Sequence, residues 1–164
     1  MPVDDIHWPS GFSPDQAHGY CRAEALVHAP PARVFALLGD TARWADWVPG
    51  VTRVRAGPLD GALDVVFLGR SFEVYVGERE PPRRLGWSGV GAGVQSYRAW
   101  LLTPVGADTH VLTAIVVRGP ATGAVRTVSD RWARRLNARW VARLKSLAEN
   151  GSQGDVDRTS RDGI

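Results

Sequence analysis

Strand-like segments joined by very short links fill the middle of the chain, and this feature limits the possible folds more than any other. The links, such as "GPLDG" and "PVGAD", hold only a few residues, several of them glycine, proline or aspartate. A parallel pair of strands needs a crossover of about a dozen residues or more, so neighbouring segments can pair only in antiparallel fashion. The segments predicted as strands are 52–56, 62–68, 71–78, 85–89, 93–103 and 109–119.

One more strand and two short helices are predicted before this run. Residues 20–28 alternate between small or apolar and longer polar side chains, as a half-buried strand does. Residues 31–38 and 40–48 each predict a short helix, and Pro31 suits the first turn of the first one.

The last predicted element is a long amphipathic helix. Between Val125 and Leu147 apolar residues recur every three or four positions, which indicates a helix of about 25 residues with one apolar face. Seven antiparallel strands with a single long helix to cover them must curve around that helix to bury their inner face. We therefore predict an α+β fold in which a curved seven-stranded antiparallel sheet wraps one long C-terminal helix.

The chain divides into three predicted parts. Residues 1–16 form an irregular N-terminal lead-in, because prolines and a glycine interrupt any regular element there. Residues 17–150 form a single domain, and 164 residues are enough for one such core. Residues 151–164 contain almost nothing apolar, and we expect a disordered tail.

Composition argues against several functional classes. No apolar run approaches the roughly 18 residues of a membrane span, and the N-terminus has acids where a secretory signal has basic residues. The single Cys21 fits a reducing compartment, so we expect a cytoplasmic protein without a membrane span. The arginines of the last helix are interpreted as its solvated face rather than as a nucleic-acid surface. We expect no nucleic-acid partner, no cofactor, no metal site, and a monomer or a homodimer.

Several stretches resemble one known superfamily. The segments "APPARVFALLGDTARWADWVPGVTRV", "EPPRRLGW" and "RLKSLAE" are similar to the SRPBCC superfamily, which includes START domains, birch-pollen-allergen-like proteins and polyketide cyclases/dehydrases. The resemblance covers roughly residues 18–149. It implies a helix-grip fold, with the two short helices between strands 1 and 2 and a deep, mostly apolar cavity between the sheet and the last helix.

This resemblance implies a protein that binds a hydrophobic small molecule, such as a polyketide-like intermediate, with or without promoting its cyclisation or dehydration. The alternative is a non-catalytic carrier or sequestering protein for a lipid, quinone or toxic metabolite. A third hypothesis is a protein-interaction module that uses the arginine-rich face of the last helix.

Strand alternation predicts which side chains face the cavity. The apolar face of 71–78 points inward and ends at Glu78, while segment 93–103 is ambiguous because Val94, Trp100 and Leu102 compete with the other face. The pattern of the family favours the face that carries Tyr97. The predicted ligand-binding residues are Trp44, Trp47, Phe72, Val74, Val76, Trp87, Gln95, Ala99, Leu101, Thr113, Ile115, Val128, Trp132 and Leu136.

Two residues are candidates for catalysis. The phenol of Tyr97 could hydrogen-bond a substrate carbonyl and assist enolisation, or it could be a core tyrosine. Glu78 could act as a base at the rim, or it could be a solvated carboxylate. Family members that process tethered polyketides carry an arginine late on the strand ending here in "VYVGERE". The predicted register turns Glu78 inward and Arg79 outward, a departure from that pattern.

We predict different positions for the two tryptophans of the second short helix. Trp44 either stacks on a ligand or seals the core, whereas Trp47 is expected to pack in the core.

Overall fold

The centre of the protein is one seven-stranded antiparallel sheet. The computed structural model describes residues 5–119 and 122–161, with side chains for 5–119 and 131–150. The strand order is β1-β7-β6-β5-β4-β3-β2, so β2 to β7 form a meander and β1 pairs with β7. The strands are β1 (Gly19–Val27), β2 (Val51–Ala56), β3 (Ala62–Phe67), β4 (Arg70–Glu80), β5 (Arg84–Gly91), β6 (Val94–Val105) and β7 (Asp108–Arg118).

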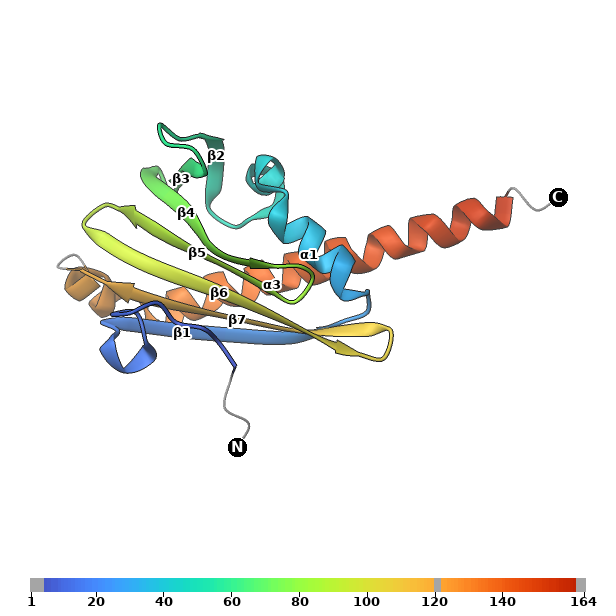
Figure 1. Ribbon diagram of the computed structural model, residues 1–164, viewed down its shortest axis with the longest axis horizontal. Coiled ribbons are helices and arrows are strands. Elements are labelled where there is room, and N and C mark those ends of the chain that lie inside the picture. The colour runs from blue at the N-terminus through green and yellow to red at the C-terminus, as the bar shows by residue number, and fades with distance from the viewer. Residues whose placement is uncertain (1–4, 120–121, 162–164) are drawn as a thin grey trace.

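The sheet curves around the long helix α3 (Thr122–Arg161), as Figure 1 shows. Two short helices, α1 (Pro31–Gly39) and α2 (Trp44–Trp47), lie between β1 and β2 and are joined by a short 3-10 turn. Pro31 stands in the first turn of α1, where its missing N–H removes no hydrogen bond. The buried face of α1 is made of Val34, Phe35 and Leu38. The predicted α+β helix-grip architecture is confirmed.

The helix α3 is longer than predicted. It continues past Asn150 to Arg161, so the predicted tail begins as helix, and residues 162–164 lie outside the described residues. The glycines and polar residues after Asn150 lower helix propensity, but none of residues 151–161 is a proline. Proline is the residue that both removes a helical donor and clashes with the preceding turn. The helix end is therefore corrected to Arg161.

Four tryptophans fill part of the space between the sheet, α2 and α3. The ring of Trp87 lies 4.8 Å from Trp44, 6.3 Å from Trp100 and 6.1 Å from Trp140. Trp100 and Trp140 meet edge to face at 5.5 Å. Aromatic pairs of this kind add about 0.5–1.5 kcal/mol each beyond the area that they bury. Trp47 is also buried in this core, as expected.

The lead-in covers part of the outer, convex face of the sheet. The ring of Trp8 packs against Tyr97 at 6.1 Å and against Tyr20 at 6.4 Å. Asp5 pairs with Arg84, and His7 Nδ1 lies 2.7 Å from Glu78 Oε2. Side chains on both faces of the central strands are therefore removed from water.

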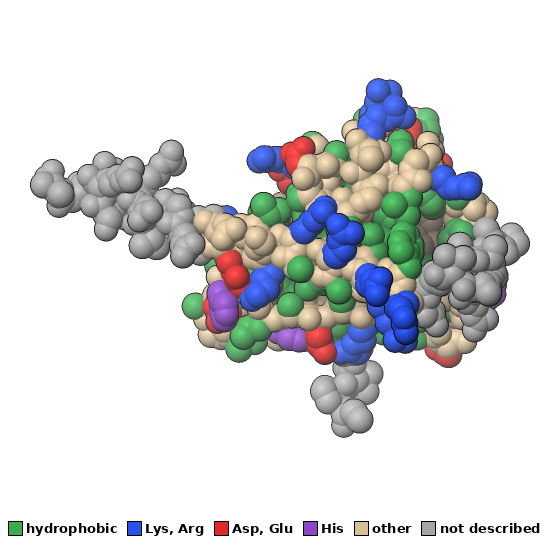
Figure 2. Space-filling view, turned by 180° about the vertical axis from the view of Figure 1, so that it is seen from behind, with side chains coloured by type: hydrophobic (Ala, Val, Ile, Leu, Met, Phe, Trp, Pro, Cys, Tyr) green, Lys and Arg blue, Asp and Glu red, His purple; other side chains and the backbone are tan. Residues whose placement is uncertain are grey.

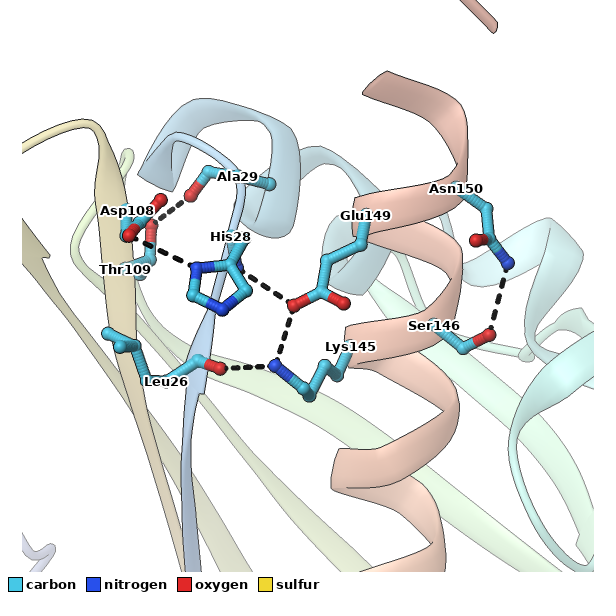
Figure 3. Close-up of polar contacts among 9 residues, drawn as sticks. All are labelled: Leu26, His28, Ala29, Asp108, Thr109, Lys145, Ser146, Glu149 and Asn150. Carbon is cyan, nitrogen blue, oxygen red and sulfur yellow. Dashed lines mark hydrogen bonds and ion pairs between the residues drawn. The ribbon is translucent and has the colours of Figure 1, made fainter. Parts of the chain in front are cut away.

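A set of polar contacts holds α3 against the end of β1 (Figure 3). Glu149 Oε1 accepts a 3.0 Å hydrogen bond from the backbone N–H of His28 and a 2.6 Å bond from Lys145 Nζ. Lys145 also donates to the carbonyl of Leu26 at 2.6 Å. These contacts hold the long helix at one end of the sheet.

Glu149→Gln is expected to lower the melting temperature at neutral pH by about 2–4 °C. The His28 N–H, and then the Lys145 ammonium, hold the pKa of Glu149 below its usual value. A carboxyl whose pKa is lower in the folded state stabilises the protein above its ordinary pKa, and this contribution is lost as the pH falls through the lowered value.

The difference between the wild type and Glu149→Gln should therefore shrink on acidification, as followed by thermal melts from pH 7 to pH 3. Asp60→Asn removes an exposed carboxylate in the β2–β3 turn and is the matched control. An equal loss in both variants at every pH would contradict a role for the Glu149 contacts.

Candidate functional site

A cavity of about 550 Å³ lies between the concave face of the sheet and α3. Strand alternation aims one side-chain row of each of β3 to β7 into it. It is lined by Trp44, Val51, Val65, Phe67, Leu68, Arg70, Phe72, Val74, Trp87, Gly89, Ala92, Val94, Ser96, Arg98, Ile115, Val117, Trp132 and Trp140. Most of these side chains are apolar, and several are large aromatic rings.

The mouth of the cavity is marked by lining residues that are also exposed. Leu68 in the β3–β4 turn is 51% exposed, and Trp132 on α3 is 43% exposed. Arg70 and Ala92, which also line the cavity, are exposed as well. Figure 2 shows hydrophobic side chains interspersed with Lys and Arg on one face of the molecule. An apolar ligand would thus meet apolar side chains before it reaches the interior.

Arg98, on β6, is the buried cation of this cavity. Only 6% of the residue is exposed. Its Nη1 donates to Thr113 Oγ1 at 3.1 Å and to Asn137 Oδ1 at 2.7 Å. Its guanidinium carbon lies 4.3 Å from the centre of the Trp140 ring, a cation–π contact. These contacts hold the guanidinium in one orientation beneath α3.

The charge of Arg98 has no counter-charge within the described part of the chain. Its hydrogen bonds go to a neutral hydroxyl and a neutral amide. Burial lowers the pKa of Arg98 to about 9, so the group remains charged at neutral pH at a cost in free energy. Among the described residues, the cavity therefore combines a mostly apolar lining with one buried positive charge that has no counter-charge.

The prediction that Tyr97 faces the cavity is wrong. Val94, Ser96 and Arg98 are the β6 residues that line it, so Tyr97 points to the convex face. There its hydroxyl occupies the space above Gly86, where a Cβ atom would collide with it. Burial, and then the nearby Glu78 carboxylate, raise the pKa of Tyr97.

Gln95, Ala99 and Leu101 share the face of Tyr97 and are misplaced in the prediction for the same reason. Hydrophobic alternation did not identify the inner face of β6 because both of its faces are buried. On the outer face Tyr97 is 4% exposed and Ala99 is 7% exposed. On the inner face Trp100 is 2% exposed and Leu102 is 0% exposed.

The predicted orientation of Glu78 is also wrong, because β4 contains a β-bulge. Val76 pairs with Trp87, but Glu78 pairs with Gly86, so the alternation shifts by one residue between them. Glu78 therefore joins the convex face, where it contacts His7. Arg79 takes the inward position instead, and its guanidinium carbon lies 5.6 Å from the centre of the Phe35 ring.

The sequence had indicated that this chain lacks the inward arginine that some family members carry late on this strand. The position of Arg79 shows that an arginine is present there. An arginine late on this strand does turn inward, although it packs on α1 and does not line the cavity.

Six of the predicted ligand-binding residues line the cavity: Trp44, Phe72, Val74, Trp87, Ile115 and Trp132. Thr113 faces the same side and supports Arg98. Trp47 packs in the core, Val76 is 43% exposed, and Leu136 is half-buried outside the lining. The side chain of Val128 lies outside the described residues.

Arg98 is the residue that sequence reasoning missed. Arg98 lies on the same face of β6 as the apolar residues Val94, Trp100 and Leu102, and it is the one charged residue in that row. A lone charged residue in the middle of a mostly apolar strand face was the available signal.

The described residues contain neither a membrane-spanning helix nor a metal-binding cluster. No helix among them is long and apolar enough to cross a membrane. No group of three or more His, Cys, Asp or Glu side chains in the same part of the chain is arranged to hold a metal ion.

Solved structures of similar fold come from several bacteria. A hypothetical protein, jhp0584, from Helicobacter pylori superposes with a TM-score of 0.80 at 18% identity, covering 90% of this chain and 98% of that one. TTHA0849 from Thermus thermophilus gives 0.66 at 18% identity, covering 82% and 99%. A START superfamily protein from Mycobacterium smegmatis gives 0.63 at 12% identity, covering 80% and 97%.

The sequence comparisons identify the family. Curated proteins provide no match. The family described as "Polyketide cyclase / dehydrase and lipid transport" matches residues 21–149, which span all seven strands except the first two residues of β1. The protein therefore belongs to this family of the SRPBCC superfamily.

Proposed function

We propose that the protein binds a hydrophobic small molecule in the cavity between its sheet and α3. The observation that carries this proposal is the cavity itself, about 550 Å³ in volume and lined mostly by apolar and aromatic side chains. Cavities of this size and composition suit small ligands, with a few polar groups to orient them. The exposed apolar side chains of Leu68 and Trp132 provide a path to the interior.

Retention of the ligand, as in a carrier or sequestering protein, is favoured over cyclisation or dehydration. Tyr97 and Glu78, the candidate acid and base, both lie on the convex face, away from the cavity. Among the residues whose side chains the structure describes, those with polar groups other than indole in the lining are Arg70, Ser96 and Arg98. Arginine is protonated at neutral pH and a serine hydroxyl is a weak base, so none of the described lining residues is suited to proton abstraction. The contribution that these three described residues could make to catalysis is to stabilise negative charge on a bound molecule.

Ile115→Trp is expected to weaken binding of an apolar probe by more than about tenfold, because the indole would occupy volume that the probe needs. Ile115 lines the cavity and is half-buried, so the larger side chain extends into the space rather than into packed core. The probe is the neutral alcohol 1-pyrenebutanol, and isothermal titration calorimetry measures its affinity.

Val105→Trp is the matched control, since Val105 is 49% exposed at the β6–β7 hairpin and outside the lining. It should bind the probe as the wild type does. Absence of binding to the wild type, or equal binding by both tryptophan variants, would refute the proposed site.

A further inference from the structure

We propose that the cavity selects hydrophobic carboxylic acids and that Arg98 binds the ligand's carboxylate through its Nε and Nη2 atoms. This inference rests on the proposed binding function and adds the chemical class of the ligand. The inference does not depend on Tyr97 or Glu78, and it gives the buried charged residue of the cavity, Arg98, a role.

The hydrogen bonds of Arg98 leave one edge of its guanidinium free. Nη1 is occupied by Thr113 and Asn137. The Nε and Nη2 atoms donate to no described residue. This edge presents two parallel N–H groups, the arrangement that matches the two oxygens of a carboxylate. The contacts at Nη1 and the Trp140 ring hold it in place before a ligand arrives.

Two other partly covered cations, Arg84 and Lys145, have carboxylate partners, and Arg98 does not. Arg84 pairs with Asp5, and Lys145 pairs with Glu149 at 2.6 Å. Arg98 is more deeply buried, and its hydrogen bonds go only to neutral oxygens. Buried charges are normally paired, because an isolated one loses its hydration without compensation. A ligand carboxylate would supply the missing partner of this buried guanidinium.

A second unsatisfied donor lies beside the same cavity. The indole Nε1 of Trp140 is buried and has no hydrogen-bond partner among the described residues, and the residue lines the cavity next to Arg98. The apolar lining of the cavity includes the aromatic rings of Trp44, Phe72 and Trp87. The site therefore suits an apolar, flat skeleton that ends in one anionic group rather than a polyanion or a sugar.

The test compares 1-pyrenebutanoic acid with 1-pyrenebutanol, which share their skeleton and differ in charge. Calorimetry at pH 7.5 should show the acid bound about 10–100-fold more tightly by the wild type. Arg98→Met should reduce the affinity for the acid to that for the alcohol while leaving alcohol binding in place. Arg98→Lys should keep only part of the preference for the acid, because an ammonium group cannot offer two parallel N–H groups to a carboxylate.

Arg55→Met is the matched control, since Arg55 is exposed on β2 and outside the lining. It should keep the full preference for the acid. A wild-type protein that binds the alcohol but prefers the acid by less than about threefold overturns the role of Arg98, whether or not the variants fold. So does a preference that survives Arg98→Met, or one lost with Arg70→Met at the mouth instead. If neither probe binds, the proposed function fails first, and this inference fails with it.

Discussion

The double variant Arg98→Met/Asn137→Leu is expected to be more stable than the wild type by roughly 1–4 kcal/mol. Arg98 is charged and has no counter-charge among the described residues, and Asn137 Nδ2 is buried without a partner among them. Apolar side chains of similar volume remove both desolvation penalties. Thr113 tolerates the change because its hydroxyl also donates to the carbonyl of Ala99 at 3.0 Å.

Urea denaturation at pH 7 measures this gain. Arg98 has a pKa below its ordinary value in the folded state, so its penalty is fully present at neutral pH and declines as the pH rises above about 9. The advantage of the double variant should decline over the same range. A variant that is less stable than the wild type would show that Arg98 is a structural residue, retained for packing rather than for a ligand.

Trp100→Ala is expected to cost about 3–5 kcal/mol, the largest loss for a single truncation in this core. Trp100 is 2% exposed and packs between the rings of Trp87 and Trp140. Its removal would leave a void that the curved sheet cannot close without moving α3. Denaturant unfolding followed by circular dichroism measures the loss.

Trp132→Ala is the comparison for this prediction. Trp132 is 43% exposed at the mouth of the cavity, so its truncation should cost about 1 kcal/mol or less. Equal losses in the two variants would contradict the division between a packed tryptophan core and an open cavity mouth.

The fold was predictable because its determinants are local. The links from "GPLDG" to "PVGAD" allow only antiparallel pairing, and the apolar repeat from Val125 identifies the helix that the sheet must cover. Each of these signals depends on neighbours along the chain. The helix end at Arg161 was missed because propensity is a weak guide where no proline stops the helix.

The candidate site was predicted less well, because it depends on contacts between distant parts of the chain. The inner face of β6 could not be chosen by hydrophobicity, since Trp8 from the lead-in covers Tyr97 on the outer face. The lead-in has no periodic pattern from which that packing could be inferred. The bulge that turns Glu78 outward becomes visible only in the pairing with Gly86, although Gly77 just before it is a weak local hint.

Where both faces of a strand are buried, a charged residue is more informative than the apolar ones. On β6 the apolar residues fit either face, but Arg98 fits only a face that gives its guanidinium polar partners. Thr113 and Asn137 provide them from β7 and α3. Neither could be assigned to Arg98 before the three-dimensional arrangement was known.

The central claim is that the cavity holds a hydrophobic ligand, and native mass spectrometry of protein purified from its own host tests it most directly. Mild dissociation should release a small hydrophobic molecule that ionises in negative mode, and Ile115→Trp should lose it. A bare chain mass that stays bare after incubation with hydrophobic acids and alcohols would contradict the account, because it would mean that the cavity takes up no ligand.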